Sequence, residues 1–251
     1  MDTSLLRRYG TPTILFVIIL GLWEMYIAIY DVSLLLLPTP RQVVGEYVQN
    51  FVKLNTFALN TLIEAFAGLV LATLLSIVAA GATFRFTKTS KMLENYSALA
   101  KSLPTVAIYP ICTVFFGIGT EAIIAIVTVG LFPIMFLYAL RGFTGVSEHD
   151  ALFDSLAART IERFIDLVLP RSVSYLMAGL KSAAPTAIII TIVAEYFGGS
   201  VTTLGAYIRR ESANLHTVEM WGAIFSSCIL GLLVFGVVVV LDRHFTRWRP
   251  E

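Results

Sequence analysis

The chain has 251 residues, of which 57% are hydrophobic and 14% are charged, and its formal net charge is +1. A soluble domain carries about 25% charged residues, and the apolar residues here gather in stretches near or beyond the ~20 residues that cross a bilayer. The composition therefore predicts an integral membrane protein. It argues against a nucleic-acid partner, because neither the net charge nor any Lys/Arg-rich run favours one.

Six apolar segments are predicted to cross the membrane, which makes this an all-α polytopic protein with one membrane domain over residues 1–251. They cover about 12–30, 58–83, 93–116, 120–140, 172–197 and 220–241. The first segment follows Arg7 and Arg8, but no small-residue cleavage site comes after it. We therefore expect a retained span rather than a signal peptide.

Prolines interrupt three of the central spans. Pro104 and Pro110 lie in the third, Pro133 in the fourth and Pro185 in the fifth. A proline bends a helix and frees a backbone carbonyl, and such breaks persist at membrane depth only where protein or water satisfies the backbone. Each proline alone could be a packing kink, but together they predict a bundle that encloses a path.

The basic residues predict the orientation of the spans. With the N-terminus in the cytoplasm, twelve Lys and Arg residues lie on the inner side, and only Arg41, Lys53, Arg209 and Arg210 lie on the outer side. Cytoplasmic loops carry the excess of positive charge in membrane proteins. Both termini, and the polar segment 141–171, are therefore predicted to be cytoplasmic.

The segment 141–171 is a charged block between two spans. Apolar residues recur at helical spacing from Asp150 to Leu169, with Ala157 and Ala158 between two short runs and Pro170 at the exit. This pattern predicts a helix–turn–helix that inserts into a groove of a partner. The alternative is an amphipathic hairpin on the membrane surface with a structural role only.

Several short motifs follow one another in an order that resembles one family of transport proteins. They include Leu37-Pro38-Thr39-Pro40, Leu103-Pro104-Thr105, Val168-Leu169-Pro170 and Ala194-Glu195-Tyr196-Phe197-Gly198-Gly199. From about Leu34 to Trp248 the chain looks like the permease subunit of a bacterial ATP-binding-cassette (ABC) importer, in the group handling nitrate, sulfonates, taurine, bicarbonate and thiamine-precursor pyrimidines. The resemblance implies a type I importer permease fold with six transmembrane helices and a cytoplasmic coupling helix–turn–helix.

In that family the coupling loop carries Glu-Ala-Ala, then a glycine, then Leu-Pro. Counting back from Pro170 places the glutamate position at Ala151 and the glycine position at Ala157, so this chain departs from the pattern at the glutamate. The residues expected to couple to an ATPase are Asp150, Ala151, Asp154, Ala157, Arg159, Leu169 and Pro170.

The resemblance also implies a set of partners in the bacterial inner membrane. No phosphate-binding Gly-x-x-x-x-Gly-Lys-Ser/Thr run occurs in the chain, so ATP and Mg²⁺ are expected on two separate ATPase subunits, with no cofactor in this chain. A second permease copy is expected, either identical or related. An external solute-binding protein is expected to dock on the outer segments 38–55 and 198–219.

Polar and ionisable residues at membrane depth are candidates for the substrate pathway, because such groups usually face protein or water. The candidates are Asn60, Glu64, Lys101, Thr105, Tyr109, Thr186 and Glu195. Lys101 could instead extend toward the cytoplasm or pair with Glu64. Hydrogen bonding between helices explains the hydroxyl residues equally well, and Glu195 could be purely structural.

The predicted function is ATP-driven import of a small solute. A nitrate-, sulfonate- or taurine-like anion and a pyrimidine- or vitamin-precursor solute both remain open. The alternative function is a gradient-driven secondary transporter, which would need an intramembrane carboxylate relay. An intramembrane enzyme and a metal site are not expected, because His149, His216, His244, Cys112 and Cys228 are dispersed without ligand spacing.

Overall fold

The computed structural model describes residues 3–83, 87–100, 104–144 and 168–246, and every regular element in these ranges is helical. The elements are α1 (Thr3–Tyr30), α2 (Pro40–Gln49), α3 (Phe51–Thr83), α4 (Thr87–Ala100), the 3₁₀ turn η1 (Thr105–Ile108), α5 (Tyr109–Phe116), α6 (Thr120–Thr144), α9 (Leu169–Gly198), α10 (Leu204–Ala213) and α11 (Thr217–Phe245). Six predicted functional residues lie outside the described ranges: Lys101, Asp150, Ala151, Asp154, Ala157 and Arg159.

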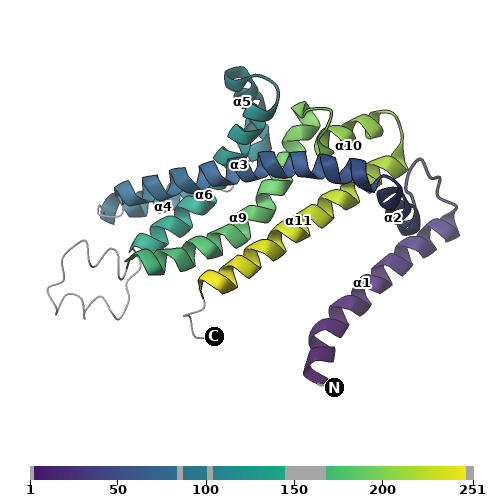
Figure 1. Ribbon diagram of the computed structural model, residues 1–251, viewed down its shortest axis with the longest axis horizontal. Helices are drawn as coiled ribbons and strands as arrows, with labels where there is room; N and C mark the ends of the chain where they lie inside the picture. The colour runs from purple at the N-terminus through teal and green to yellow at the C-terminus, as the bar shows by residue number, and fades with distance from the viewer. Residues whose placement is uncertain (1–2, 84–86, 101–103, 145–167, 247–251) are drawn as a thin grey trace.

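Five helices are long and apolar enough to cross a membrane: α1 over Thr13–Tyr30, α3, α6, α9 over Pro170–Gly198, and α11. They correspond to five of the six predicted spans, with α3 beginning seven residues earlier than the predicted 58. Figure 1 shows α3, α6, α9 and α11 side by side, with α4 at one end and α2 and α10 at the other. The predicted all-helical membrane fold is thus confirmed.

The predicted third span, 93–116, is not one helix. α4 ends at Ala100, and a short apolar piece, Thr105–Phe116, follows as η1 and α5. Pro104 stands just before η1 and Pro110 in the first turn of α5, where the missing N–H of a proline is tolerated. The chain then turns at Gly117 and Gly119, whose φ angles of 78° and 134° favour glycine. In Figure 1, α5 projects from the bundle.

The other two central prolines do not end their helices. α6 continues through Pro133 and α9 through Pro185. α6 forms much of the core between α3 and α9, and Ile123, Ile126 and Leu131 are fully buried on it. Only the third predicted span is therefore divided, at η1 and α5, while α6 and α9 remain continuous through their prolines.

Small residues let the central helices approach closely. A Cβ added to Gly68 of α3 would lie 2.6 Å from the Cβ of Val127 on α6, and one on Gly142 of α6 would lie 2.9 Å from the Cα of Ser172 on α9. Such contacts are the usual way in which membrane helices pack. The bundle of α3, α6 and α9 is consequently tight on both sides of α6.

α1 stands apart from this bundle (Figure 1), and only 6% of its 18-residue apolar stretch is buried. It touches the rest of the molecule near its C-terminal end, where the rings of Trp23 and Trp221 are 5.3 Å apart. Next to this contact the Thr217 hydroxyl donates to the Leu35 carbonyl oxygen at 2.7 Å. Most of the apolar surface of α1 is therefore open to lipid or to another chain.

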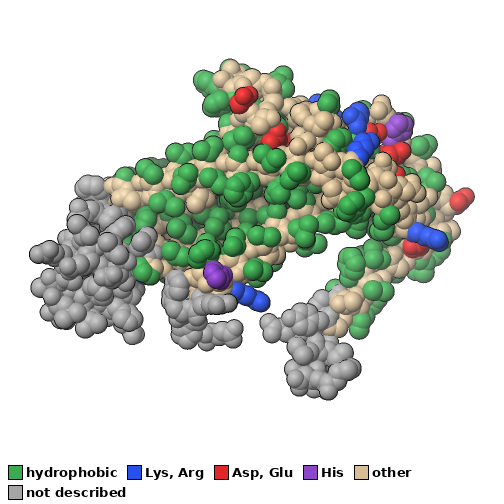
Figure 2. Space-filling model, in the orientation of Figure 1, with side chains coloured by type: hydrophobic (Ala, Val, Ile, Leu, Met, Phe, Trp, Pro, Cys, Tyr) green, Lys and Arg blue, Asp and Glu red, His purple; other side chains and the backbone are tan. Residues whose placement is uncertain are grey.

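Charged side chains gather at the end of the molecule that carries α2 and α10, whereas the sides of the bundle are largely hydrophobic (Figure 2). α2 begins with a complete capping box: Gln42 N–H donates to Thr39 Oγ1 at 3.3 Å, and Thr39 N–H donates to Gln42 Oε1 at 2.9 Å. Tyr207 of α10 is buried beneath the ammonium of Lys53, which lies 4.4 Å from its ring centroid. This end of the molecule is therefore ordered by specific contacts.

Candidate functional site

Two buried glutamates from different helices meet inside the bundle. Glu64 of α3 is 5% exposed and Glu195 of α9 is fully buried, and their carboxyl groups are in contact. The Thr120 hydroxyl donates to Glu64 Oε1 at 2.7 Å. Thr61 Oγ1 donates to Glu195 Oε2 at 3.0 Å, so that α3, α6 and α9 are joined by one polar cluster.

The same cluster holds the beginning of α10. Gly205 N–H donates to Glu195 Oε2 at 2.8 Å, and Leu204 N–H donates to Thr61 Oγ1 at 3.1 Å. The side chain of Thr203, the residue before α10, makes no capping hydrogen bond to the N–H groups of the helix. The free N–H groups of the first turn are thus satisfied by side chains of α3 and α9, and the negative charge there suits the positive end of the helix dipole.

Position 205 accepts only glycine in this arrangement. A Cβ there would clash with the Ile192 carbonyl oxygen and would lie 2.6 Å from the Cβ of Glu195. The backbone of α10 can therefore lie directly on α9 because residue 205 has no side chain. This contact brings the Gly205 N–H within reach of the buried carboxylate.

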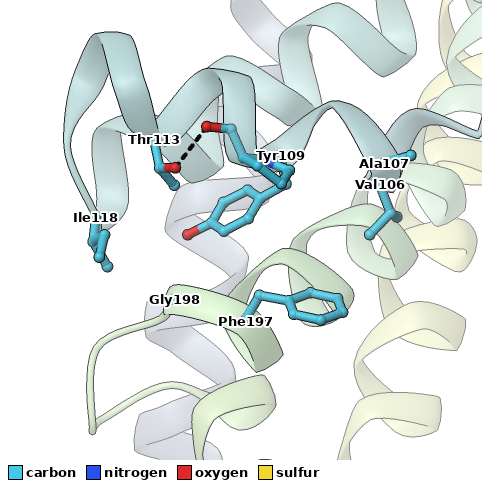
Figure 3. Close-up of a pocket in the computed structure, with 8 residues that line it drawn as sticks. Val106, Ala107, Tyr109, Thr113, Ile118, Phe197 and Gly198 are labelled. Atoms are coloured by element: carbon cyan, nitrogen blue, oxygen red, sulfur yellow. Dashed lines mark hydrogen bonds between the residues drawn. The ribbon is translucent and has the colours of Figure 1, made fainter.

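A cavity of about 420 Å³ opens beside the cluster, between α5 and the end of α9. Its lining residues are Val106, Ala107, Tyr109, Pro110, Thr113, Ile118, Phe197 and Gly198. Figure 3 shows the rings of Tyr109 and Phe197 on its two sides, and their centroids are 6.5 Å apart. No lining residue is charged, and a cavity of this size suits a small organic molecule.

Tyr109 connects the cavity with the glutamates. Its side chain is 5% exposed, and its hydroxyl has no hydrogen-bond partner. A Cβ at position 198 would clash with this hydroxyl, so Gly198 leaves the space into which the tyrosine points. The lining residues Phe197 and Gly198 lie two and three positions after Glu195 on α9, which keeps the cavity and the carboxyl pair adjacent.

The remaining pathway candidates are dispersed. The Asn60 side chain donates to the Thr202 carbonyl oxygen at 2.9 Å and ties α3 to the loop before α10. Thr105 packs against Gly130 of α6, and the half-buried Thr186 donates to the carbonyl oxygen of Ser182 in its own helix. These three side chains do not line the cavity, and Glu64 pairs with Glu195 and Thr120 within the described residues.

Phe197, Thr113 and Thr120 were not among the predicted site residues. The Phe197 position belongs to a run that the sequence marks, Glu195 to Gly199, but nothing in that run indicates which side of α9 faces a cavity. Thr120 lies 56 residues from Glu64 in the sequence. Its role depends on helix packing and has no local signal.

At the other end of the bundle, the two ends of the predicted coupling segment are fixed to each other. Pro170 lies in the first turn of α9. The Arg171 guanidinium donates to the carbonyl oxygens of Gly142 at 3.0 Å and Phe143 at 3.2 Å, in the last turn of α6. A cation at a helix C-terminus is favourable, so the segment between these helices leaves and returns at one fixed point.

Lys181 of α9 forms an ion pair with Asp242 of α11. Its Nζ lies 2.5 Å from Asp242 Oδ2 and connects α9 to α11.

At the charged end of the molecule, Glu211 of α10 is bonded to Arg210 at 3.0 Å and to His216 at 2.9 Å. Burial raises the pKa of Glu211, but these two partners outweigh it and hold the pKa below its ordinary value.

A bundle of membrane-length apolar helices, with a cavity and ionisable groups enclosed among them, defines a membrane transport protein rather than an anchor. The chain belongs to the family described as "Binding-protein-dependent transport system inner membrane component", which matches residues 72–247. It is therefore an import permease of the ABC type, as its sequence motifs predicted.

Relatives of similar length carry different substrate names. The chain is 25% identical to the formylaminopyrimidine transport permease protein ThiX of Halalkalibacterium halodurans, over 96% of each chain. It is 24% identical to the putative aliphatic sulfonates transport permease protein SsuC of Bacillus subtilis, over 97% of this chain and 90% of that one. The transport class is common to both relatives, whereas the solute is not.

The fold is also that of a solved transporter. A chain of the MetNI methionine ABC transporter in an inward-facing conformation superimposes with a TM-score of 0.57 at 18% identity, covering 84% of this chain and 99% of that one. This likeness confirms the predicted ABC permease fold.

Proposed function

We propose that this permease imports a small, planar, uncharged organic solute, of the kind named for ThiX, through the cavity between α5 and α9. The observation that carries the proposal is the aromatic lining, with the rings of Tyr109 and Phe197 among uncharged lining residues. Flat rings gain favourable contact from aromatic side chains. The solute is expected to contact these two rings during its passage.

The charge around the cavity favours this solute over an anion. Among the described residues that line the space there is no lysine or arginine, and Glu64 acts on the Tyr109 phenol more strongly than the exposed Arg209 does. A nitrate or sulfonate would lose hydration without gaining a positive partner among these lining residues, and the adjacent negative charge would repel it. Aliphatic sulfonate transport, named for SsuC, is the second candidate.

We propose that ATP hydrolysis by two separate subunits drives the transport and reaches this chain through segment 141–171. ATP and Mg²⁺ would be bound entirely by those partners. The fixed junction of α6 and α9 at Arg171 supports the proposal, because a force on the segment would move both helices together. Leu169 and Pro170, at the return of the segment into α9, would transmit that movement.

Two further partners complete the proposed assembly in the bacterial inner membrane. A second permease copy, most simply an identical one, would cover apolar side chains such as Val114, Phe115 and Ile118, which are 77–81% exposed. The charged end with α2 and α10 would face outward and receive the solute-binding protein, with both termini in the cytoplasm. The charge concentrated at this end supports docking of a soluble partner.

The test is uptake in proteoliposomes that contain the complete transporter, purified through a tag on this chain. ATP-dependent uptake of a formylaminopyrimidine, exceeding that of taurine or an alkanesulfonate, is expected. Phe197→Ala should reduce uptake at limiting solute roughly 2- to 10-fold, the range of one aromatic contact. Phe66→Ala, at an exposed position on α3, is the matched control and should leave uptake unchanged.

Two results would contradict the proposal. Preferred uptake of an alkanesulfonate would reject the aromatic solute while keeping the importer. Uptake driven by an ion gradient without ATP, together with the absence of any copurified ATPase, would reject the importer assembly.

A further inference from the structure

The contact between Glu64 and Glu195 leaves one oxygen of each carboxyl group without a protein donor. Glu64 Oε1 and Glu195 Oε2 accept hydrogen bonds from Thr120, Thr61 and Gly205. Glu64 Oε2 and Glu195 Oε1 are buried without a hydrogen-bond partner. Since the two carboxyl groups touch, the two unpaired oxygens mark a place where a donor is missing.

Within the part of the chain that the structure describes, no positive charge balances the pair. Among the described residues, neither glutamate takes part in an ion pair. The groups that face the pair are the Thr61 hydroxyl on α3, the Thr120 hydroxyl on α6, the Gly205 N–H on α10 and the Tyr109 phenol on α5. The nearest arginine of α10, Arg209, is exposed and donates instead to the Phe197 carbonyl oxygen at 3.3 Å.

Electrostatics makes the doubly ionised state of such a pair unfavourable. Two adjacent carboxylates in a buried site repel each other, and one of them normally retains a proton. An unpaired buried acceptor also loses the hydrogen bond it would make with water. A proton placed between the two oxygens removes the repulsion and supplies the missing donor at once.

We propose that Glu64 and Glu195 together bind one proton, which forms a hydrogen bond between Glu64 Oε2 and Glu195 Oε1. The pair then carries a single negative charge, and all four carboxyl oxygens have a partner. The proton comes from water and returns to water when it dissociates, with no other bond made or broken. This site is independent of which solute is carried.

The shared proton holds three helices at the cavity. With it, Glu195 can remain next to α3 while capping α10 through Gly205. Without it, two negative charges lie between α3 and α9, and the α10 cap is pushed from its position. We therefore expect the junction of α3, α9 and α10 to loosen at alkaline pH.

Infrared spectroscopy of the purified transporter tests the proposal directly. A protonated carboxyl group has a separate C=O stretching band that shifts in D₂O. The wild-type protein should show this band at neutral pH and lose it at alkaline pH. Glu64→Gln and Glu195→Gln should each remove it, and Glu121→Gln, at an exposed position in the first turn of α6, should leave it.

Thermal stability distinguishes a shared proton from two independent carboxyl groups. In either single variant, the amide oxygen can keep the existing donors while the NH₂ group donates to the remaining carboxylate. The apparent Tm should therefore fall little at pH 7, and it should not fall further at alkaline pH. In the double variant two NH₂ groups face each other, and the Tm should fall by at least about 5 °C.

Three results would overturn the proposal. The C=O stretching band of a protonated carboxyl group could be absent from the wild-type spectrum, or could persist in one of the two single variants. The double variant could be as stable as the two single variants. Sodium or potassium ions could raise the Tm of the wild type but not of Glu195→Gln, which would assign the site to a cation. None of these measurements requires transport, so a wrong solute or missing ATPase would not affect them.

Discussion

Replacing Gly205 by alanine tests whether the start of α10 is held by the buried glutamate. The added methyl group would clash with the Ile192 carbonyl oxygen and lie 2.9 Å from the Tyr196 nitrogen. Because both neighbours are backbone atoms of α9, they cannot rotate away, and α10 must move. That movement breaks the 2.8 Å hydrogen bond from Gly205 N–H to Glu195.

The magnitude follows from these two effects. Overpacking in a tight contact costs about 1–3 kcal/mol, and a buried carboxyl oxygen that loses its donor adds about 1–3 kcal/mol. A total of about 2–6 kcal/mol should lower the apparent Tm in detergent by roughly 4–24 °C, at about 2–4 °C per kcal/mol. Differential scanning fluorimetry of the purified complex measures this change.

The matched control is Gly231→Ala in α11. A Cβ at position 231 meets nothing within 4 Å, and alanine is favoured over glycine inside a helix by about 0.5–1 kcal/mol. This variant should therefore equal or exceed the wild-type Tm. If Gly205→Ala unfolds at the same temperature as Gly231→Ala, the proposed support of α10 by Glu195 is wrong.

Three other changes have expected outcomes. Ala157→Trp should abolish ATP-driven uptake while membrane insertion stays normal, and unimpaired uptake would refute the coupling role of this position. Asp242→Asn should lower the free energy of unfolding by less than about 1 kcal/mol, and so the Tm only slightly, because Lys181 is 38% exposed and its ion pair is partly screened; a larger loss would show that this pair holds α9 to α11. The pKa of Glu211 is lowered in the folded protein, so its stabilising contribution is complete above the ordinary glutamate pKa and is lost as the pH falls through the lowered value. Tm measured from neutral to acid pH should fall less in Glu211→Gln than in the wild type, and equal slopes would contradict this assignment.

Hydropathy was sufficient to predict the helical membrane fold, because a long apolar segment has few alternatives to a helix in a bilayer. The segment 93–116 was predicted as a span interrupted by two prolines, and the structure forms it as two separate helical pieces. Its two pieces are separate because Pro104 and Pro110 begin η1 and α5. Apolar composition alone cannot distinguish a bent span from a broken one.

The candidate site was predicted less completely than the fold. Glu64, Tyr109 and Glu195 were selected as candidates because ionisable or hydroxyl groups at membrane depth are uncommon. The arrangement of these residues was not predicted, because the side chains that meet there come from distant parts of the chain. Thr61 and Glu195, for example, are 134 positions apart. The same rule selected Thr186, whose hydroxyl is satisfied by its own helix, because composition does not indicate which face of a helix meets the cavity.

The capped helix α2 has a consequence for recognition at the charged end. Thr39 and Gln42 exchange hydrogen bonds, and Tyr207 of α10 is held beneath Lys53. A surface already ordered before a partner arrives loses little conformational entropy when the complex forms. Association at this end should therefore be governed by matching of charge and shape, with rates that decrease as ionic strength rises, rather than by folding of loops around the partner.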